Sequence, residues 1–292
     1  MPFAFLPEDT DVEAALRRIA REQATEALVR AREGGGEGME SRVHGMRKAV
    51  KKLRGLLRLV RPVMQGWRAE NEALRDAGRG LSSLRDAAVL LGTAGRLAEG
   101  MEEPRREALL APLRAEAEAQ GAAAPEGALP AFAEAMEALL DRLEDWRLRA
   151  SGWEALEPGL AATWEGARAT LRAAEAAPDE AEALHEWRKR VKDHWYQARL
   201  LAPIWPEMME PHVAAADALG ETLGEVNDLA VLAERLAALD VAPDLAEEAL
   251  TRAAALRAER LALAFPLGRR LFAGRSEHLL ARWRVWWERR AA

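Results

Sequence analysis

The chain has 292 residues, no cysteine and a formal net charge of −6. The missing cysteines exclude disulfides and thiolate metal sites, which fits a reducing cytoplasm. A hydrophobic fraction of 49% excludes a disordered chain, and the wealth of Ala, Leu, Glu and Arg favours helices. Tyrosine occurs once and β-branched residues are sparse, so we expect an all-α fold.

The sequence shows no signal for export or membrane insertion. Its first residues, MPFAFLPEDTD, have an apolar stretch too short and too soon acidic for a signal peptide. The longest nearly apolar run, residues 87–95, is far shorter than the roughly 20 residues that a membrane span needs. We therefore expect a soluble, cytoplasmic protein without membrane contact.

Helical periodicity fills the sequence, and glycine and proline interrupt it. In the first half we expect helices over residues 8–32, 39–61, 67–98 and 104–120, then a loop over 121–130 and a helix to about 150. Several glycines predict that the segment 67–98 is kinked or split. In the second half we expect helices over residues 153–173, 178–201, 206–236, 243–263 and 267–290. Short connectors between amphipathic helices predict antiparallel bundles.

Two segments of the first half return in the second half. Residues 44–51 (HGMRKAVK) match residues 185–192 (HEWRKRVK), and eight of 19 positions are identical between 44–62 and 185–203. Residues 84–90 (LRDAAVL) then resemble residues 226–232 (VNDLAVL) at nearly the same offset. Two segments that recur in the same order at nearly one offset indicate an internal duplication. We expect two similar antiparallel bundles, residues 1–150 and 151–292, related by a pseudo-two-fold axis.

The first repeated segment is an amphipathic helix with a basic face in both copies. At 100° per residue, its histidine and cations share a stripe about 100° wide, opposite an apolar face. The stripes contain His44, Arg47, Lys48, Lys51 and Arg58 in the first copy, and His185, Arg188, Lys189, Lys192, Tyr196 and Arg199 in the second.

No acidic residue occurs between Ser41 and Ala69. For either helix alone, a solvated basic face is an ordinary explanation. The repeated stripe, which nothing nearby in the sequence neutralises, instead predicts an anionic ligand.

These residues resemble a known family. The two basic helices, each followed by an Asp-containing segment (Arg85-Asp86 and Asn227-Asp228), resemble the paired signature helices of the CHAD domain, the conserved histidine α-helical domain. The resemblance covers about residues 8–290. It implies two four-helix-type bundles that form a basic groove or pore for inorganic polyphosphate. Many family members are fused to a triphosphate-tunnel (CYTH) domain; this chain looks like a stand-alone member.

The resemblance also places particular residues on the polyphosphate. These are His44, Arg47, Lys48, Lys51, Lys52, Arg54 and Arg58 in the first half, and His185, Arg188, Lys189, Lys192, Tyr196 and Arg199 in the second. The second copy departs from the first where Asp193 matches Lys52 and Trp195 matches Arg54. We therefore expect the first helix to contribute more of the binding energy.

The two aspartates Asp86 and Asp228 have two interpretations. As general bases they would point to catalysis, but we expect each to pair with a cation of a signature helix and position it. Neither His44 nor His185 has a histidine or carboxylate one turn further on its stripe, and the surrounding cations repel metals, so we expect no metal site. His194 falls on the core face, where we expect a buried structural histidine.

The C-terminal segment mixes arginine with tryptophan. Interleaved cations and aromatic rings can bind single-stranded nucleic acid by stacking. However, Trp283, Trp286 and Trp287 follow helical spacing, and we expect them to form a core stripe with the arginines outside.

The sequence contains no P-loop, nucleophile elbow, dinucleotide loop or paired-carboxylate metal motif. We therefore expect a binding protein without catalysis or cofactor, whose partner is inorganic polyphosphate. Recruitment to polyphosphate granules or regulation of phosphate metabolism would use such binding. One alternative is a nucleic-acid-binding protein, although the net charge of −6 counts against it. Another is a metal-dependent polyphosphate-processing enzyme, which would need a carboxylate cluster.

Overall fold

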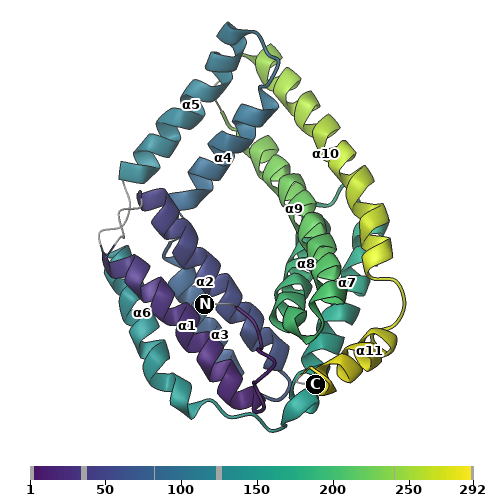
Figure 1. Ribbon diagram of the computed structural model, residues 1–292. Helices are drawn as coiled ribbons and strands as arrows, with labels where there is room; N and C mark the ends of the chain where they lie inside the picture. Colours follow the sequence, from purple (N-terminus) through teal and green to yellow (C-terminus); the bar gives the residue numbers. More distant parts are fainter. Residues whose placement is uncertain (1–2, 34–37, 82, 123–126, 240, 291–292) are drawn as a thin grey trace.

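The computed structural model describes residues 3–33, 38–81, 83–122, 127–239 and 241–290, without the side chains of residues 33, 40, 83–87 and 120–122 (Figure 1). These ranges form eleven α-helices and three short 3₁₀ helices, with no β-strand. A single antiparallel bridge joins Met64 to Leu148. The prediction of an all-α fold is confirmed.

Six helices precede residue 150 and five follow it. The first six are α1 (Val12–Glu33), α2 (Met39–Val60), α3 (Trp67–Arg79), α4 (Ser83–Leu97), α5 (Glu103–Ala122) and α6 (Ala128–Arg142). The others are α7 (Glu157–Ala176), α8 (Ala181–Leu201), α9 (Pro206–Leu236), α10 (Pro243–Leu271) and α11 (Ser276–Glu288). The 3₁₀ helices are η1 (Leu143–Asp145), η2 (Gly152–Ala155) and η3 (Ala202–Ile204).

The order of elements agrees between the halves, except that α9 is continuous where the first half has α3 and α4. The expected split of the segment 67–98 is thus confirmed, and it falls where Gly78 and Gly80 weaken the helix. This shared order fits the expected duplication. The duplication itself, and the boundary near residue 150, stay predictions.

Local sequence explains several helix ends. The Asp11 carboxylate accepts the backbone N–H of Glu13 at 2.8 Å and so caps the first turn of α1. Prolines begin α9 and α10, where their missing N–H costs no hydrogen bond. Gly274, with φ of +80°, allows the turn between α10 and α11.

Two hydrophobic cores hold the helices together, and each takes residues from both halves of the chain. The larger core is built mainly from α1, α2 and α6 together with α7, α8, α11 and parts of α9 and α10. The smaller lies at the far end, where α4 and α5 pack on the end of α9 and the start of α10 (Figure 1). Both halves therefore contribute to one connected fold.

Helix α2 lies at the centre of the larger core because small residues let its neighbours approach. A Cβ on Gly159 of α7 would lie 1.7 Å from the carbonyl oxygen of Leu59, so only glycine allows this crossing. On the other side, a Cβ on Gly55 of α2 would lie 2.8 Å from Cβ of Tyr196 in α8. The two signature helices thus pack directly against one another.

Some predicted helix boundaries are wrong. Helix α10 continues through Pro266 to Leu271, because Phe265 stacks on Trp187 with ring centroids 5.3 Å apart and Gly268 packs on the same indole. Helix α6 ends at Arg142 instead of 150, and the chain then pairs briefly with Met64. Tertiary packing overrides the local breaker in the first case, and backbone pairing to a distant segment ends the helix in the second.

Candidate anion-binding cleft

A cleft of about 590 Å³ lies between α2 and α8, which carry the two basic stripes. Ten of the thirteen residues expected on the ligand line it: His44, Lys48, Lys51, Arg54, Arg58, Arg188, Lys189, Lys192, Tyr196 and Arg199. Five further residues complete the lining: Arg190, Asp193, Trp195, Asp217 and Glu221. The two stripes therefore face one shared space and not opposite outer surfaces.

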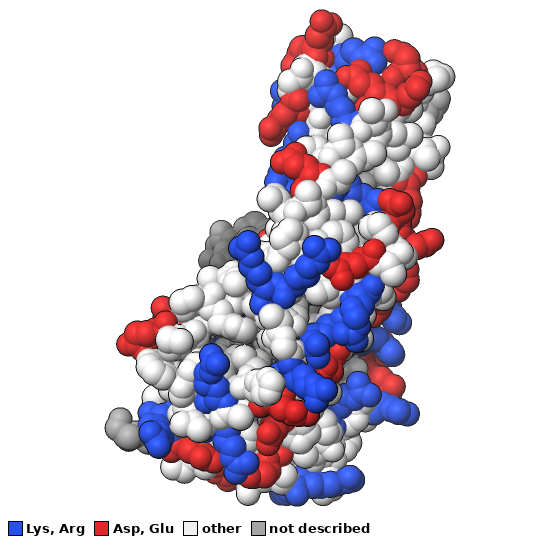
Figure 2. Space-filling view, turned by 90° about the vertical axis from the view of Figure 1, so that its right-hand side faces the viewer, with Lys and Arg blue, Asp and Glu red and all other residues white. Residues whose placement is uncertain are grey.

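The cleft is strongly positive in a protein that is negative as a whole. Nine lysine and arginine side chains line it with three carboxylates, an excess of six positive charges. The whole chain has a net charge of −6. On the outer face seen in Figure 2, acidic and basic side chains are interleaved from top to bottom. A concentrated positive charge inside a mixed surface attracts anions to the cleft itself.

Arg47, Lys52 and His185, also expected on the ligand, do not line the cleft. The ammonium of Lys52 donates to Gln23 of α1 at 2.6 Å and lies over the Phe3 ring, and burial lowers its pKa. His185 Nδ1 is 2.8 Å from Oδ1 of Asn227 in α9. Lys52 and His185 therefore join α2 and α8 to their neighbours.

Asp193 joins the two signature helices inside the cleft. Its carboxylate accepts a hydrogen bond from Arg58 of α2 at 2.6 Å and one from Arg190 at 3.2 Å. Only 7% of the Asp193 side chain is exposed, and burial raises its pKa although Arg58 and Arg190 oppose the shift. The alignment of the two repeated segments identified Asp193 as a missing cation but gave no sign of this ion pair, because Arg58 is 135 residues away.

Aromatic rings form part of the lining. The Trp195 ring lies 3.9 Å from the ammonium of Lys192 and 5.0 Å from the guanidinium of Arg199, distances typical of cation–π contacts. Tyr196 is tilted against Trp195, and burial raises the pKa of its phenol to about 12. The phenol is therefore a neutral hydrogen-bond donor at physiological pH.

Two glycines of α9 make room for the cations of α8. A Cβ on Gly224 would lie 3.2 Å from Nη2 of Arg188, and one on Gly220 would lie 2.5 Å from Cδ of Lys192. These glycines are four residues apart, as are Arg188 and Lys192. The side chains of both cations therefore lie against the same face of α9. The Gly-x-x-x-Gly spacing is the sequence signal from which this close approach could have been predicted.

Two hydrogen-bond donors of the lining are buried without an acceptor among the described residues. They are Nε of Arg188 and Nε1 of Trp195. A buried donor without an acceptor costs about 1–3 kcal/mol, so oxygen atoms of an anion would be stabilised beside them. Burial and charge in this cleft thus both favour an anionic ligand.

Comparisons with known proteins agree with this geometry. The family model described as the CHAD domain matches residues 13–237. The chain belongs to the CHAD domain family. The crystal structure of the CHAD domain from the plant Ricinus communis is similar with a TM-score of 0.67 and 24% identity, over 94% of this chain and 93% of that one.

A second solved structure has the same fold. PptA from Streptomyces chartreusis is similar with a TM-score of 0.64 and 17% identity, over 89% of this chain and 99% of that one. No curated protein sequence matches the chain. At these identities the structural likeness shows the fold alone.

Of the two aspartates that follow the CHAD signature helices, Asp228 has a described side chain, and it does not pair with a cation of a signature helix as we expected. Asp228 forms no ion pair with a described residue; its Oδ1 lies 3.5 Å from Nδ2 of Asn227. The neighbouring Asn227, not Asp228, contacts the signature helix through His185. The side chain of Asp86 lies outside the described residues.

The histidine His194 is buried on the core face of α8, as predicted. Its Nε2 lies 2.7 Å from Nε2 of His212 in α9, so one neutral imidazole donates and the other accepts. Burial lowers the pKa of His212 to about 4, and burial together with His212 lowers that of His194 well below its ordinary value. The role of His212 could not be predicted from residue spacing, because its partner lies on another helix.

The tryptophans of α11 pack as predicted. Trp283 and Trp287 are 2% and 3% exposed, and Trp286 is partly buried against the same core. Within the described ranges, no group of three or more His, Asp or Glu side chains is placed to hold a metal ion. Of the helices described, none combines the length and apolarity needed to cross a membrane.

Proposed function

We propose that this CHAD domain binds inorganic polyphosphate in the cleft between α2 and α8, without catalysis. The observation that carries the proposal is the charge of the cleft, nine lysines and arginines against three carboxylates. Both basic stripes contribute to it. A linear polymer carrying one charge per phosphate satisfies such a row of cations and releases counterions on binding.

The length of the cleft fits a polymer better than a single phosphate. From His44 to Arg58 the stripe extends about 21 Å at a rise of about 1.5 Å per residue. Cations from α8 lie across from it and include Arg188, which has a buried donor without an acceptor among the described residues. Phosphates bound along α2 therefore find further donors on the opposite wall.

The chemistry of the lining supports binding over turnover. Phosphoryl transfer needs metal ions held by carboxylates, or a positioned base beside the attacking oxygen. The three carboxylates of the cleft instead contact cations: Asp193 contacts Arg58 and Arg190, while Asp217 and Glu221 contact Lys192. In the cell, such binding would recruit the protein to cytoplasmic polyphosphate granules or regulate phosphate metabolism.

A competition titration tests the ligand. Labelled long-chain polyphosphate bound to the protein is challenged with short polyphosphate, duplex DNA, single-stranded DNA and RNA at one salt concentration. We expect unlabelled long-chain polyphosphate to displace the label at the lowest concentration, since a narrow cleft admits a thin chain more readily than a duplex. Stronger displacement by a nucleic acid would reject the proposal in favour of a nucleic-acid-binding protein.

A phosphate-release assay tests the absence of catalysis. The protein is incubated with polyphosphate and magnesium or manganese, and we expect no phosphate above the protein-free background. Metal-dependent release that disappears in Asp86→Ala or Asp228→Ala would show that the protein is an enzyme.

A further inference from the structure

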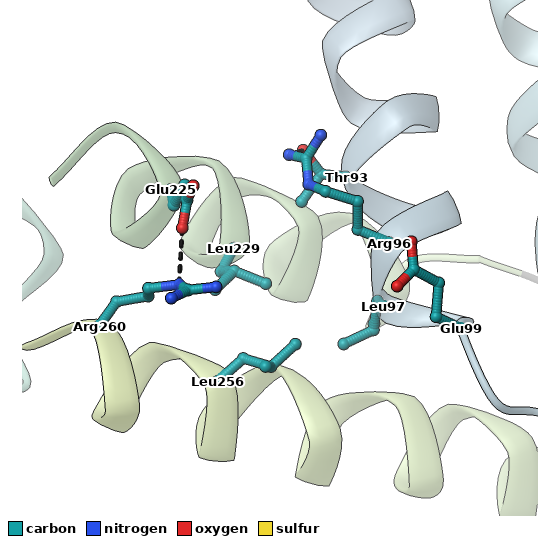
Figure 3. A pocket seen from close by; sticks show the side chains of 8 residues that line it. All are labelled: Thr93, Arg96, Leu97, Glu99, Glu225, Leu229, Leu256 and Arg260. Atoms are coloured by element: carbon teal, nitrogen blue, oxygen red, sulfur yellow. Dashed lines mark hydrogen bonds and ion pairs between the residues drawn. The ribbon is translucent and has the colours of Figure 1, made fainter. Parts of the chain in front are cut away.

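Three carboxylates follow one face of α9 at intervals of four residues. They are Asp217, Glu221 and Glu225, and the spacing places each about one helical turn beyond the last. Asp217 and Glu221 line the cleft between α2 and α8. Glu225 lines a smaller pocket of about 180 Å³, bounded by α4, α9 and α10 (Figure 3).

Each carboxylate of this row contacts a cation of a neighbouring helix. The ammonium of Lys192 in α8 lies 3.2 Å from Oδ1 of Asp217 and 2.9 Å from Oε1 of Glu221. Further along, Nε of Arg260 in α10 lies 2.6 Å from Oε2 of Glu225, the contact drawn in Figure 3. The three carboxylates thus pair with Lys192 and Arg260, two cations of the second half of the chain, as the charges of a bound polyanion would.

Lys192 is held more firmly than an ordinary surface lysine. Its stem passes Gly220, where a Cβ would lie 2.5 Å from the lysine Cδ, and its ammonium lies over the Trp195 ring. Only 20% of its side chain is exposed. An ammonium has three donors, and two of them already point to carboxylates. A phosphate that reaches Lys192 must therefore displace or share these contacts.

The carboxylate of Glu221 is kept in its charged form by Lys192. Burial alone would raise the pKa of Glu221, but the hydrogen bond from Lys192 and its charge hold that pKa below its usual value. Asp217 is 45% exposed and lies on the same ammonium. Both carboxylates also stand beside the path of any anion in the cleft, and like charges repel it.

We propose that Asp217 and Glu221 are internal competitors for phosphate at Lys192, which limit the affinity for a polyanion and the net number of counterions released when it binds. This inference rests on the proposed binding of polyphosphate. A chain anchored on α2 brings its next phosphates to Lys192 at a high effective concentration and displaces the carboxylates there. When the chain leaves, the carboxylates return, so the competition favours rapid exchange.

The test compares two double variants of α9 with the same change in net charge. Asp217→Asn with Glu221→Gln removes the competitors. Glu207→Gln with Glu234→Gln removes two carboxylates of the same helix that line none of the pockets described above. Affinity for long-chain polyphosphate is measured for the native protein and both variants at several salt concentrations, after circular dichroism has shown that they are folded.

We expect the first variant to bind about tenfold more tightly than the native protein, and the control to change by less than about twofold. The slope of log K against log salt should become steeper in the first variant by somewhat under one unit, because no displaced carboxylates remain to take up cations when a phosphate binds Lys192. Adding Lys192→Ala to the first variant should abolish most of the gain.

The possible failures are distinguishable. If the native protein binds polyphosphate but both double variants gain equally, the competitors act only through net charge and the inference is wrong, while the proposed function stands. If neither the native protein nor the variants bind polyphosphate, the proposed function fails and this inference fails with it.

Discussion

The two signature helices share a sequence register but differ in their surroundings. Helix α2 carries Glu40 in its first turn, but from Ser41 to Ala69 no acidic residue occurs. Helix α8 contains Glu186, which pairs with Lys189, and the acids Asp217 and Glu221 of α9 face its Lys192. The two copies of the motif therefore differ in their electrostatic surroundings. Carboxylates from other helices determine whether a cation of the motif is available to a ligand.

The core faces differ as well. Helix α2 places Leu53 where α8 places His194, and both side chains are almost fully buried. The leucine only packs, whereas the histidine needs His212 to satisfy its ring nitrogen. The second half therefore carries a titratable pair in its core at a position where the first half is aliphatic.

The largest expected effect is a difference between the two basic stripes in how much polyphosphate affinity each contributes. Replacing Lys48 and Lys51 of α2 by alanine should weaken polyphosphate binding about a hundredfold, because two charge-assisted contacts of about 1.5 kcal/mol each are lost. The equivalent replacement of Lys189 and Lys192 in α8 should cost less, because both already donate to carboxylates. Equilibrium titration of both variants checks the order, and a greater loss for the α8 variant would contradict it.

Next in size is an effect on stability at the ion pair between the two helices. Arg58→Ala should lower the free energy of unfolding by about 3 kcal/mol, because it removes a charged partner from the buried carboxylate of Asp193. Lys48→Ala, in the same cleft, serves as the control and should leave stability nearly unchanged. Urea unfolding measures both.

A second substitution shows whether the buried charge is the cause. Combining Arg58→Ala with Asp193→Asn should restore much of the lost stability, since an amide is buried at a lower cost than an unpaired carboxylate. If the double variant is no more stable than Arg58→Ala, the loss comes from packing and not from the ion pair.

The histidine pair of the second half predicts a dependence of stability on pH. Because burial holds the pKa of His212 at about 4, below the 6.5 of an unfolded histidine, the unfolded state binds more protons between these values. Stability is then fully present above about pH 6.5 and falls as the pH decreases toward 4, with a loss of about 2 kcal/mol from His212 by about pH 5.

Urea unfolding at several pH values between about 5 and 7.5 measures this loss. The variant that combines His194→Leu with His212→Leu makes α8 resemble α2 at this position, and its stability should vary much less over the same range. An unchanged pH dependence in that variant would mean that other groups cause it.

The smallest effect concerns the salt dependence of single cations. Lys51→Ala should flatten the slope of log K against log salt by somewhat under one unit, as expected for one lost phosphate contact. Lys192→Ala, at the equivalent register, should change the slope less, because its ammonium already lies between two carboxylates. Equal changes in slope would mean that the two stripes contact the ligand alike.

Much of the fold could be predicted from the sequence. Helical periodicity and breakers were enough to predict the all-α class, a kink or split within the segment 67–98 and the core positions of His194 and Trp283. The common register of the two stripes was enough to predict that His44 and Arg199, far apart in the chain, lie in one cleft. These features follow from local patterns that repeat within single helices.

The contacts between helices could not be predicted in the same way. Neither the pairing of Arg58 with Asp193 nor that of Lys192 with Glu221 follows from spacing, since each joins side chains of different helices. Lys52 has the same charge and helix as Lys51 but turns to Gln23 of α1, because its angle around α2 differs. The positions of the charged residues around each helix were therefore easier to predict than the residues that they contact.

A crystal structure of the protein with long-chain polyphosphate would test the proposed binding most directly. We predict phosphate density along the cleft, within hydrogen-bond distance of Lys48 and Lys51 on α2 and of Arg188 and Arg199 on α8. We also predict that the ammonium of Lys192 contacts a phosphate and has separated from Asp217 or Glu221. Phosphate density on another surface, such as the arginines of α11, with the cleft carrying none, would contradict polyphosphate binding between the two signature helices.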